Sequence, residues 1–206
     1  MQIGIIGSGM IGSTVAKLAV DHGHTVKIAN SRGPNTLGDL VAELGEGATA
    51  VEVADTAEGS DFVVVAIPLK AIGEIPVEPF DGVVVADANN YYSSRDGEIP
   101  ELESGEKTSS ELLADHLAGA KVVKAFNTMN FRKLADDGDS SKPEDERLAL
   151  FVAGDDAAAK QVVEDFIEQA GFGAVDAGSL ADGGKLEPES PVYGADLSVA
   201  EARAAL

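Results

Sequence analysis

Cysteine and tryptophan are both absent from the 206 residues, and aromatic residues make up only 5% of the sequence. Without cysteine there is no disulfide framework, no zinc–thiolate site and no cysteine nucleophile. Basic residues are also scarce, because 15 Lys and Arg stand against 36 Asp and Glu and give a formal net charge of −21. Since nucleic acids and anionic membranes attract basic surfaces, this charge argues against both as partners.

Long hydrophobic runs are missing as well. The longest apolar stretches, such as residues 62–67, are far shorter than the roughly 20 residues that a membrane-spanning helix needs. The first residues also lack the basic region and apolar core of a signal peptide. We therefore expect a cytoplasmic protein. Its acidity suits a salt-rich cytoplasm, and an ordinary acidic protein is the alternative interpretation.

The charge is unevenly distributed along the chain. Residues 1–32 contain Lys17, Lys27 and Arg32 against Asp21, a net charge of +2, so the other 174 residues carry −23. The first segment thus escapes the acidic bias of the rest.

Short apolar runs alternate with stretches in which apolar residues recur at helical spacing. The runs predict strands at residues 2–6, 25–29, 50–53, 62–67, 83–86, 122–126, 148–152 and 174–176, and the spacing predicts helices at 10–22, 36–44, 109–117 and 157–170. Most of the strands are continuously apolar, which is typical of a parallel sheet covered on both faces. The alternation predicts an α/β fold of the Rossmann-like, doubly wound type with a mostly parallel sheet.

Acidic and turn-forming residues are concentrated in two further segments. Residues 92–107 and 136–146 predict solvated loops. A Gly- and Pro-rich stretch follows residue 180, and residues 196–206 predict a short helix with Asp196 or Ser198 near its cap. We predict a nucleotide-binding domain over residues 1–180 and a short C-terminal extension, residues 181–206, that belongs to the same compact unit.

A glycine-rich turn, G-S-G-M-I-G at residues 7–12, joins the first predicted strand to the first predicted helix. This context is typical of a dinucleotide-binding site. Gly7 permits the tight turn, Gly9 lets a pyrophosphate approach the backbone, and Gly12 lets helix and strand pack closely. The free N–H groups at the helix start favour phosphate. The alternative is an ordinary strand–helix turn.

Asn30, Ser31 and Arg32 follow the second predicted strand. An NAD-binding domain normally has Asp or Glu at this place, on the ribose 2′-hydroxyl. A carboxylate would repel a 2′-phosphate, whereas amide, hydroxyl and guanidinium groups can bind one. The sequence therefore favours NADP over NAD, unless Arg32 only solvates its loop.

Candidate ligand-binding residues also follow three later strands, where a doubly wound sheet binds its ligands. They are Ile67 and Pro68, then Asn89, Asn90 and Tyr91, and finally Asn127, Thr128 and Asn130. The apolar pair could form a wall for a nicotinamide ring, and the amides could bind a polar substituent of that ring. The alternatives are a proline that ends a strand and asparagines that form turns.

No acid–base dyad and no metal-ligand spacing stands out. His22 and His24 are predicted to cap the end of the first helix. Hydride transfer between two bound cofactors needs proximity and orientation more than a protein acid or base. Reduction of a free carbonyl usually needs a proton donor, and the candidates are Tyr91, Tyr92, Tyr193, Lys124 and Arg132.

Several of these segments together resemble one family. They are the glycine turn, Asn30–Arg32, residues 66–68 and above all V-V-K-A-F-N-T at 122–128, with 152–156 and 176–180 fitting as well. The chain resembles the NADP oxidoreductases that depend on the deazaflavin coenzyme F420, and the related cytoplasmic domain of the STEAP metalloreductases. The resemblance covers about residues 1–180, and the tail from residue 188 does not match.

The resemblance implies a Rossmann domain, NADP(H), a homodimer, and hydride transfer to or from a deazaflavin or flavin. It implies that Ser31 and Arg32 hold the 2′-phosphate and that Ser8, Met10 and Ile11 line the pyrophosphate. The residues implied at the nicotinamide end are Ile67, Pro68, Ala125 and Asn127, and Asn89 is also expected there. Two alternatives stay open. One is a reductase of a small carbonyl or imine with Tyr91 or Tyr193 as donor, and the other is an NADP-binding sensor without turnover.

Overall fold

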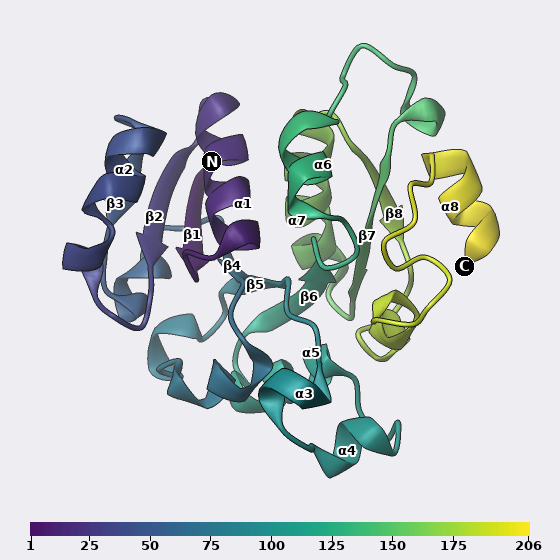
Figure 1. Ribbon diagram of the computed structural model, residues 1–206, viewed down its shortest axis with the longest axis horizontal. Coiled ribbons are helices and arrows are strands. Elements are labelled where there is room, and N and C mark those ends of the chain that lie inside the picture. Colours follow the sequence, from purple (N-terminus) through teal and green to yellow (C-terminus); the bar gives the residue numbers. More distant parts are fainter.

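Eight strands form one sheet in the order β3-β2-β1-β4-β5-β6-β7-β8 in the computed structural model, which describes residues 1–206 (Figure 1). They are β1 (Gln2–Ile6), β2 (Thr25–Ala29), β3 (Ala48–Ala50), β4 (Phe62–Val65), β5 (Val84–Asp87), β6 (Lys121–Ala125), β7 (Ala149–Gly154) and β8 (Gly173–Asp176). Neighbouring strands pair in parallel except β6 and β7, which are antiparallel. The predicted doubly wound α/β fold is confirmed.

Eight α-helices surround the sheet. They are α1 (Met10–Asp21), α2 (Gly38–Leu44), α3 (Ser93–Asp96), α4 (Pro100–Glu103), α5 (Ser109–His116), α6 (Phe131–Asp136), α7 (Ala157–Gln169) and α8 (Val199–Ala205). No helix of the structure combines the length and the apolarity that a membrane crossing requires.

Alternating side chains of the strands build a core on each face of the sheet. On one face, α1, α6 and α7 pack on β1, β4 and β6, and Figure 1 shows α1 beside α6 and α7. On the other face, α5 and several short 3-10 turns cover β4 to β6. The C-terminal extension covers β7 and β8 there, with Leu186, Val192 and Val199 buried against Phe151 and Val175.

Several boundaries differ from the prediction. The third strand is Ala48–Ala50 instead of residues 50–53, and Val53 already belongs to the 3-10 turn Val53–Thr56. Residues 92–107 contain α3 and α4 instead of an open loop, and α6 was not predicted. Asn130 caps α6 by accepting a hydrogen bond from the Arg132 N–H at 3.0 Å. Ser198, not Asp196, caps α8.

The two histidines after α1 have different surroundings. His22 Nδ1 lies 2.9 Å from the Leu18 carbonyl, as a helix-capping side chain would. His24 is buried against Phe166, with 5.7 Å between ring centres, and its Nδ1 lies 3.1 Å from the amino group of Met1. The prediction that His24 caps the helix is therefore wrong.

Parallel pairing brings the carboxyl ends of β1, β2, β4, β5 and β6 to one edge of the sheet. The reversed β7 and its parallel partner β8 end at the opposite edge. The C-terminal extension then returns to the first edge, where the Gly194 N–H donates to the Thr128 carbonyl at 2.9 Å. This edge carries the candidate site.

Candidate functional site

Two cavities meet over the glycine turn at the carboxyl edge of the sheet. The first, about 570 Å³, extends from the turn to Arg32, and we call it the Arg32 cavity. The second, about 460 Å³, extends to Tyr193, and we call it the Tyr193 cavity. Their shared lining consists of Gly9, Ala66, Ile67 and Pro68. The two cavities are thus parts of one cleft, and Ile67 and Pro68 lie at its middle.

The three glycines of the turn have distinct surroundings. Gly7 has a φ of 113°, and a Cβ on it would lie 2.2 Å from the Ala66 carbonyl oxygen. A Cβ on Gly12 would lie 1.9 Å from the Gly7 carbonyl oxygen. Around Gly9, by contrast, a Cβ would meet nothing within 4 Å. Gly7 and Gly12 thus allow the close backbone packing of the turn, and Gly12 lines neither cavity. Gly9 instead faces open space in the cleft.

Gly9 is also the residue that precedes α1. No side chain caps this helix start, and its first turn contains no acidic residue. The first N–H groups of a helix have no acceptor within the helix and carry a partial positive charge. The start of α1 therefore offers donors to an anion in the cleft, with Ser8 lining one cavity and Met10 and Ile11 the other.

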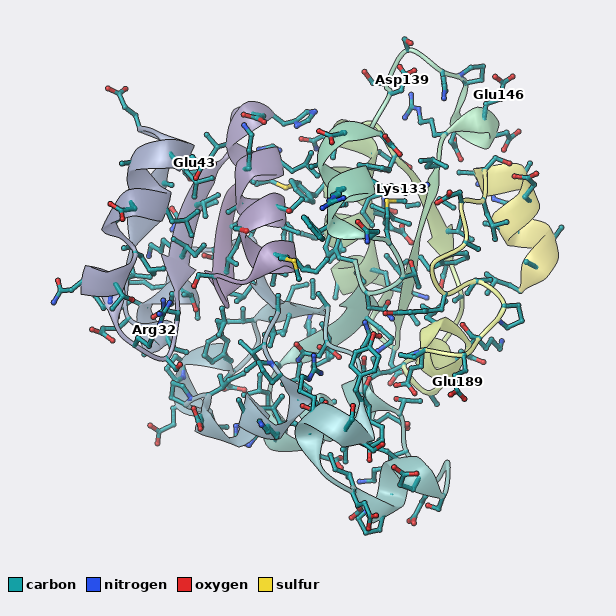
Figure 2. The ribbon with its side chains drawn as sticks, in the orientation of Figure 1. Arg32, Glu43, Lys133, Asp139, Glu146 and Glu189 are labelled. Carbon is teal, nitrogen blue, oxygen red and sulfur yellow. The ribbon has the colours of Figure 1, made fainter.

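The loop after β2 forms the far end of the Arg32 cavity. Asn30 is buried and its amide joins the two turns: Nδ2 donates to Ser8 Oγ at 3.2 Å, and Oδ1 accepts from the Arg32 N–H at 2.9 Å. Ser31 and Arg32 are exposed and line the cavity. Arg32 is the single basic residue in its lining and makes no ion pair (Figure 2).

Two asparagines beside the Tyr193 cavity each keep one polar atom without a partner. Asn89 Oδ1 accepts from the Ile67 N–H at 2.8 Å, which leaves its Nδ2 unpaired. Asn127 Nδ2 donates to the Leu186 carbonyl at 2.7 Å, which leaves its Oδ1 unpaired. The backbone partners fix which way each amide points, because an N–H can only donate and a carbonyl can only accept. One buried donor and one buried acceptor thus remain.

The end of β6 is bent by an unusual backbone conformation. Phe126 has a φ of 63°, in the left-handed region that residues with a side chain rarely adopt. The chain turns there, and Asn127, Met129 and Asn130 line the cavity after it. Ala125, which the resemblance placed at the nicotinamide end, is fully buried in the core and lines neither cavity.

Only some of the candidate proton donors line the cleft. Tyr92 and Tyr193 line the Tyr193 cavity. Tyr91 does not, because its hydroxyl donates to Glu103 at 2.6 Å, and this hydrogen bond raises the pKa of Tyr91 above its usual range. Arg132 is exposed outside the cavity lining. Tyr91 and Arg132 are therefore not positioned as donors in the cleft.

Arg95 lines the Tyr193 cavity and was missed by the sequence analysis. Its guanidinium donates to the Asn90 carbonyl at 2.6 Å, pairs with Asp96 at 2.8 Å and lies 5.0 Å from the centre of the Tyr92 ring. The acidic composition of residues 92–107 gave no signal for this placement.

A buried charged network lies behind Asn89. Lys124 is fully buried, and its Nζ donates to Ser109 Oγ at 2.9 Å and lies 3.8 Å from Glu187 Oε1. Asp87, also fully buried, accepts from Ser110 Oγ at 2.6 Å and from the Asn89 N–H at 3.0 Å. Burial raises the pKa of Asp87, and Lys124 and these hydrogen bonds oppose the rise. Lys124 is thus not a donor in the cleft, and the network joins the C-terminal extension to the strand ends.

Comparison with known proteins gives a family. Residues 2–91, which include the glycine turn and the loop with Arg32, match the model of the family described as NADP oxidoreductase, coenzyme F420-dependent. The first 91 residues of the chain thus match this oxidoreductase family. The resemblance inferred from the sequence is confirmed, and NADP is the cofactor of the family.

Two solved structures are similar to nearly the whole chain. A hypothetical protein, SMa0349 from Sinorhizobium meliloti, is 33% identical with a TM-score of 0.84, over 96% of this chain and 95% of that one. A structure from Arthrobacter sp. FB24, provisionally described as an F420-dependent NADP reductase, is 28% identical with a TM-score of 0.74, over 90% and 89%.

The rat metalloreductase STEAP3 is 25% identical over 186 residues, which is 90% of this chain and 36% of STEAP3. The chain thus spans about a third of the length of this curated relative. A reductive aminase from Aspergillus terreus, in complex with NADPH and ethyl levulinate, has a TM-score of 0.60 over 88% of this chain and 56% of that one. The two chains are only 16% identical, so the comparison shows a shared fold alone.

Proposed function

We propose that this protein transfers a hydride between NADP(H) and a deazaflavin or flavin. The observation that carries the proposal is the single cleft with open space at Gly9 in its middle, an unpaired arginine at one end and, at the other, two asparagines that each keep one buried amide atom unpaired. These three features lie in the order in which NADP presents its 2′-phosphate, pyrophosphate and nicotinamide.

Gly9 and Arg32 would form the phosphate-binding half of the cleft. A pyrophosphate would occupy the open space at Gly9, against the N–H groups at the start of α1, with Ser8, Met10 and Ile11 around it. Arg32 and the Ser31 hydroxyl would bind the 2′-phosphate, since an exposed guanidinium without an ion pair can form charge-assisted hydrogen bonds with it. Asn30 would hold this loop in place through its bonds to Ser8 and Arg32.

Asn89 and Asn127, each with one unpaired amide atom, would form the nicotinamide half of the cleft. A nicotinamide carboxamide carries one carbonyl and one NH₂ group. Asn89 Nδ2 could donate to the carbonyl, and Asn127 Oδ1 could accept from the NH₂ group. An unpaired buried polar atom costs about 1–3 kcal/mol, so a ligand that pairs both would gain affinity. Ile67 and Pro68 would pack against the ring.

The mechanism requires orientation more than proton transfer. When bound, NADPH supplies the hydride from its nicotinamide ring. The residues of this chain would fix that ring between the Ile67–Pro68 wall and the amides, and would exclude water from the reacting face. The Tyr193 cavity, which continues past the ring position to Met10, Met129 and Phe131, would hold the second substrate.

The test is oxidation of NADPH by oxidised coenzyme F420 or by FMN, followed by absorbance with the purified protein. The matched control is Gly9→Val, which should keep the fold and lose the cofactor. If NADPH binds with micromolar affinity and neither acceptor is reduced, the proposed acceptor class is wrong.

A second candidate is reduction of a small carbonyl or imine, favoured by the Tyr193 hydroxyl in the cavity. Turnover of a carbonyl and amine panel in the absence of any flavin would support it. NADPH binding without hydride exchange across both panels would instead indicate an NADP-binding sensor.

A further inference from the structure

Two tyrosine hydroxyls meet at the wall of the Tyr193 cavity. Tyr92 follows β5 and Tyr193 lies in the C-terminal extension, 101 residues away, yet their oxygens are 2.5 Å apart. Both side chains line the cavity. The backbone bond from Gly194 to Thr128 holds the segment of Tyr193 against the end of β6.

The hydrogens of this tyrosine pair can be counted. The Asn90 amide Nδ2, at 3.4 Å, can only donate to Tyr193, and Asn90 Oδ1 is occupied by Asn127 Nδ2 at 3.1 Å. The pair has two hydroxyl hydrogens, and the bond between the two oxygens uses one. No other protein acceptor lies within hydrogen-bond distance of either hydroxyl. One hydroxyl hydrogen is therefore left without an acceptor in the protein.

The direction of the bond between the two hydroxyls follows from their neighbours. The Arg95 guanidinium over the Tyr92 ring draws electron density from that phenol and makes its hydroxyl the stronger donor. Tyr193 then accepts from both Tyr92 and Asn90, and its own hydrogen is the one that remains free. Burial and the Tyr92 contact raise the pKa of Tyr193, so the phenol keeps its proton at neutral pH.

We propose that the Tyr193 hydroxyl donates a hydrogen bond to a carbonyl oxygen of the second substrate that is conjugated with the ring atom that receives the hydride. This inference rests on the proposed function and specifies its substrate class. In the direction of NADPH oxidation, the hydride carries two electrons to the acceptor's ring atom, a carbon in a deazaflavin and a nitrogen in a flavin, and NADP⁺ remains. Negative charge develops on the conjugated oxygen, and a proton from water neutralises it. A fixed donor stabilises such developing charge.

The test compares three Tyr→Phe variants with FMN and oxidised coenzyme F420 as acceptors. Tyr193→Phe should lower kcat/KM for the acceptor by about 100-fold, the usual effect of removing one such donor. NADPH binding, measured by its fluorescence, should stay within about twofold of the wild type. Tyr92→Phe should lower kcat/KM less than tenfold, because Tyr193 keeps its hydrogen. Tyr91→Phe is the matched control, since its hydroxyl bonds to Glu103 outside the cavity, and it should change nothing.

The outcomes separate this inference from the proposed function. If the wild type oxidises NADPH with neither acceptor, the proposed function fails first. If the wild type turns over and Tyr193→Phe matches it, the inference about Tyr193 is overturned. It is also overturned if Tyr193→Phe weakens NADPH binding as much as it slows the acceptor reaction, because the residue would then be structural. A flat profile of kcat/KM between pH 6 and 9 in the wild type would agree with a phenol that stays protonated.

Discussion

At the scale of the residue, neighbouring glycines in one turn differ in what a side chain would meet. A methyl group on Gly12 would collide with the backbone of Gly7, whereas one on Gly9 would project into the cleft. The same substitution should therefore damage the fold at one position and only the binding site at the other.

Gly9→Val should leave the circular dichroism spectrum and the melting temperature close to those of the wild type. The Kd for NADPH should rise at least about 100-fold, because the side chain would occupy the place of the pyrophosphate. Titration calorimetry measures the loss, and Gly12→Val, which should lower the melting temperature instead, is the control. NADPH binding that survives in Gly9→Val would contradict the assignment of the turn.

Arg32→Ala should separate the two nicotinamide cofactors. The Kd for NADPH should rise about 10- to 150-fold, since a hydrogen bond to a charged group contributes about 1.5–3 kcal/mol, while the Kd for NADH should change less than about twofold. Fluorescence titration of both cofactors checks this, with the exposed Arg132→Ala as control. Equal losses of affinity for NADPH and NADH would contradict the assignment of Arg32 to the 2′-phosphate.

His24 should give the folded protein a pH dependence in a narrow range. Burial, with the adjacent Met1 amino group, lowers its pKa from 6.5. Below pH 6.5 the unfolded chain therefore takes up a proton that the folded chain does not, so stability falls as the pH falls. The urea midpoint should drop more between pH 7.5 and 5.5 in the wild type than in His24→Gln. The control is His22→Gln, and a drop of equal size in His24→Gln would refute the role of His24.

At the scale of the element, β6 carries two lysines in opposite environments. Lys124 is fully buried between Asp87 and Glu187, whereas Lys121 is exposed and pairs with Asp156 at 3.0 Å. The first lysine joins β6 to α5 and the C-terminal extension, because Ser109 and Glu187 complete its surroundings.

Lys124→Met should lower the free energy of unfolding by about 3–5 kcal/mol, because it leaves the buried Asp87 carboxylate without its cation. Lys121→Met, the matched control on the same strand, should cost less than about 1 kcal/mol. Urea unfolding measures both. Adding Asp87→Asn to Lys124→Met should recover part of the loss, and no recovery would show that the two charges are not coupled.

The sequence predicts strands better than the path of the C-terminal extension. Runs such as Phe62–Val65 are apolar on both faces, so local composition is sufficient to identify them. The contacts that complete the Tyr193 cavity join residues far apart, such as Tyr92 with Tyr193, and a single sequence contains no signal for them. The bend at Phe126 cannot be predicted from the sequence either, because no local residue pattern indicates that a phenylalanine adopts a positive φ.

The error at Ala125 has the same origin. Asn127, two residues further on, lines the Tyr193 cavity, but Ala125 lies before the bend at Phe126 and packs in the core shared with α7. Matching a motif residue by residue thus located the strand end correctly and misplaced one of its side chains.

At the scale of the whole molecule, the net charge of −21 is spread over the surface. Glu43, Asp139 and Glu146 lie on its outer parts (Figure 2). A charge this far from zero repels itself in the compact state, and salt screens that repulsion over a Debye length of about 10 Å at 0.1 M.

The melting temperature should therefore rise with salt, by several degrees between 0.05 and about 1 M NaCl, and calorimetry measures it. Choline chloride, which supplies a different cation, is the control for specific ion binding. A melting temperature that is constant or falls with both salts would show that self-repulsion is not a significant term. The homodimer is a separate proposal, which light scattering at both salt concentrations would test.

The late position of Tyr193 in the sequence determines when the cleft can be completed during synthesis. The phosphate-binding half uses residues 6–75, which emerge early from the ribosome. The other half needs Tyr193, Leu186 and Glu187, which reach the strand ends only after β7 and β8 have been added to the sheet. A nascent chain could thus bind the phosphates of NADPH well before it can hold an acceptor.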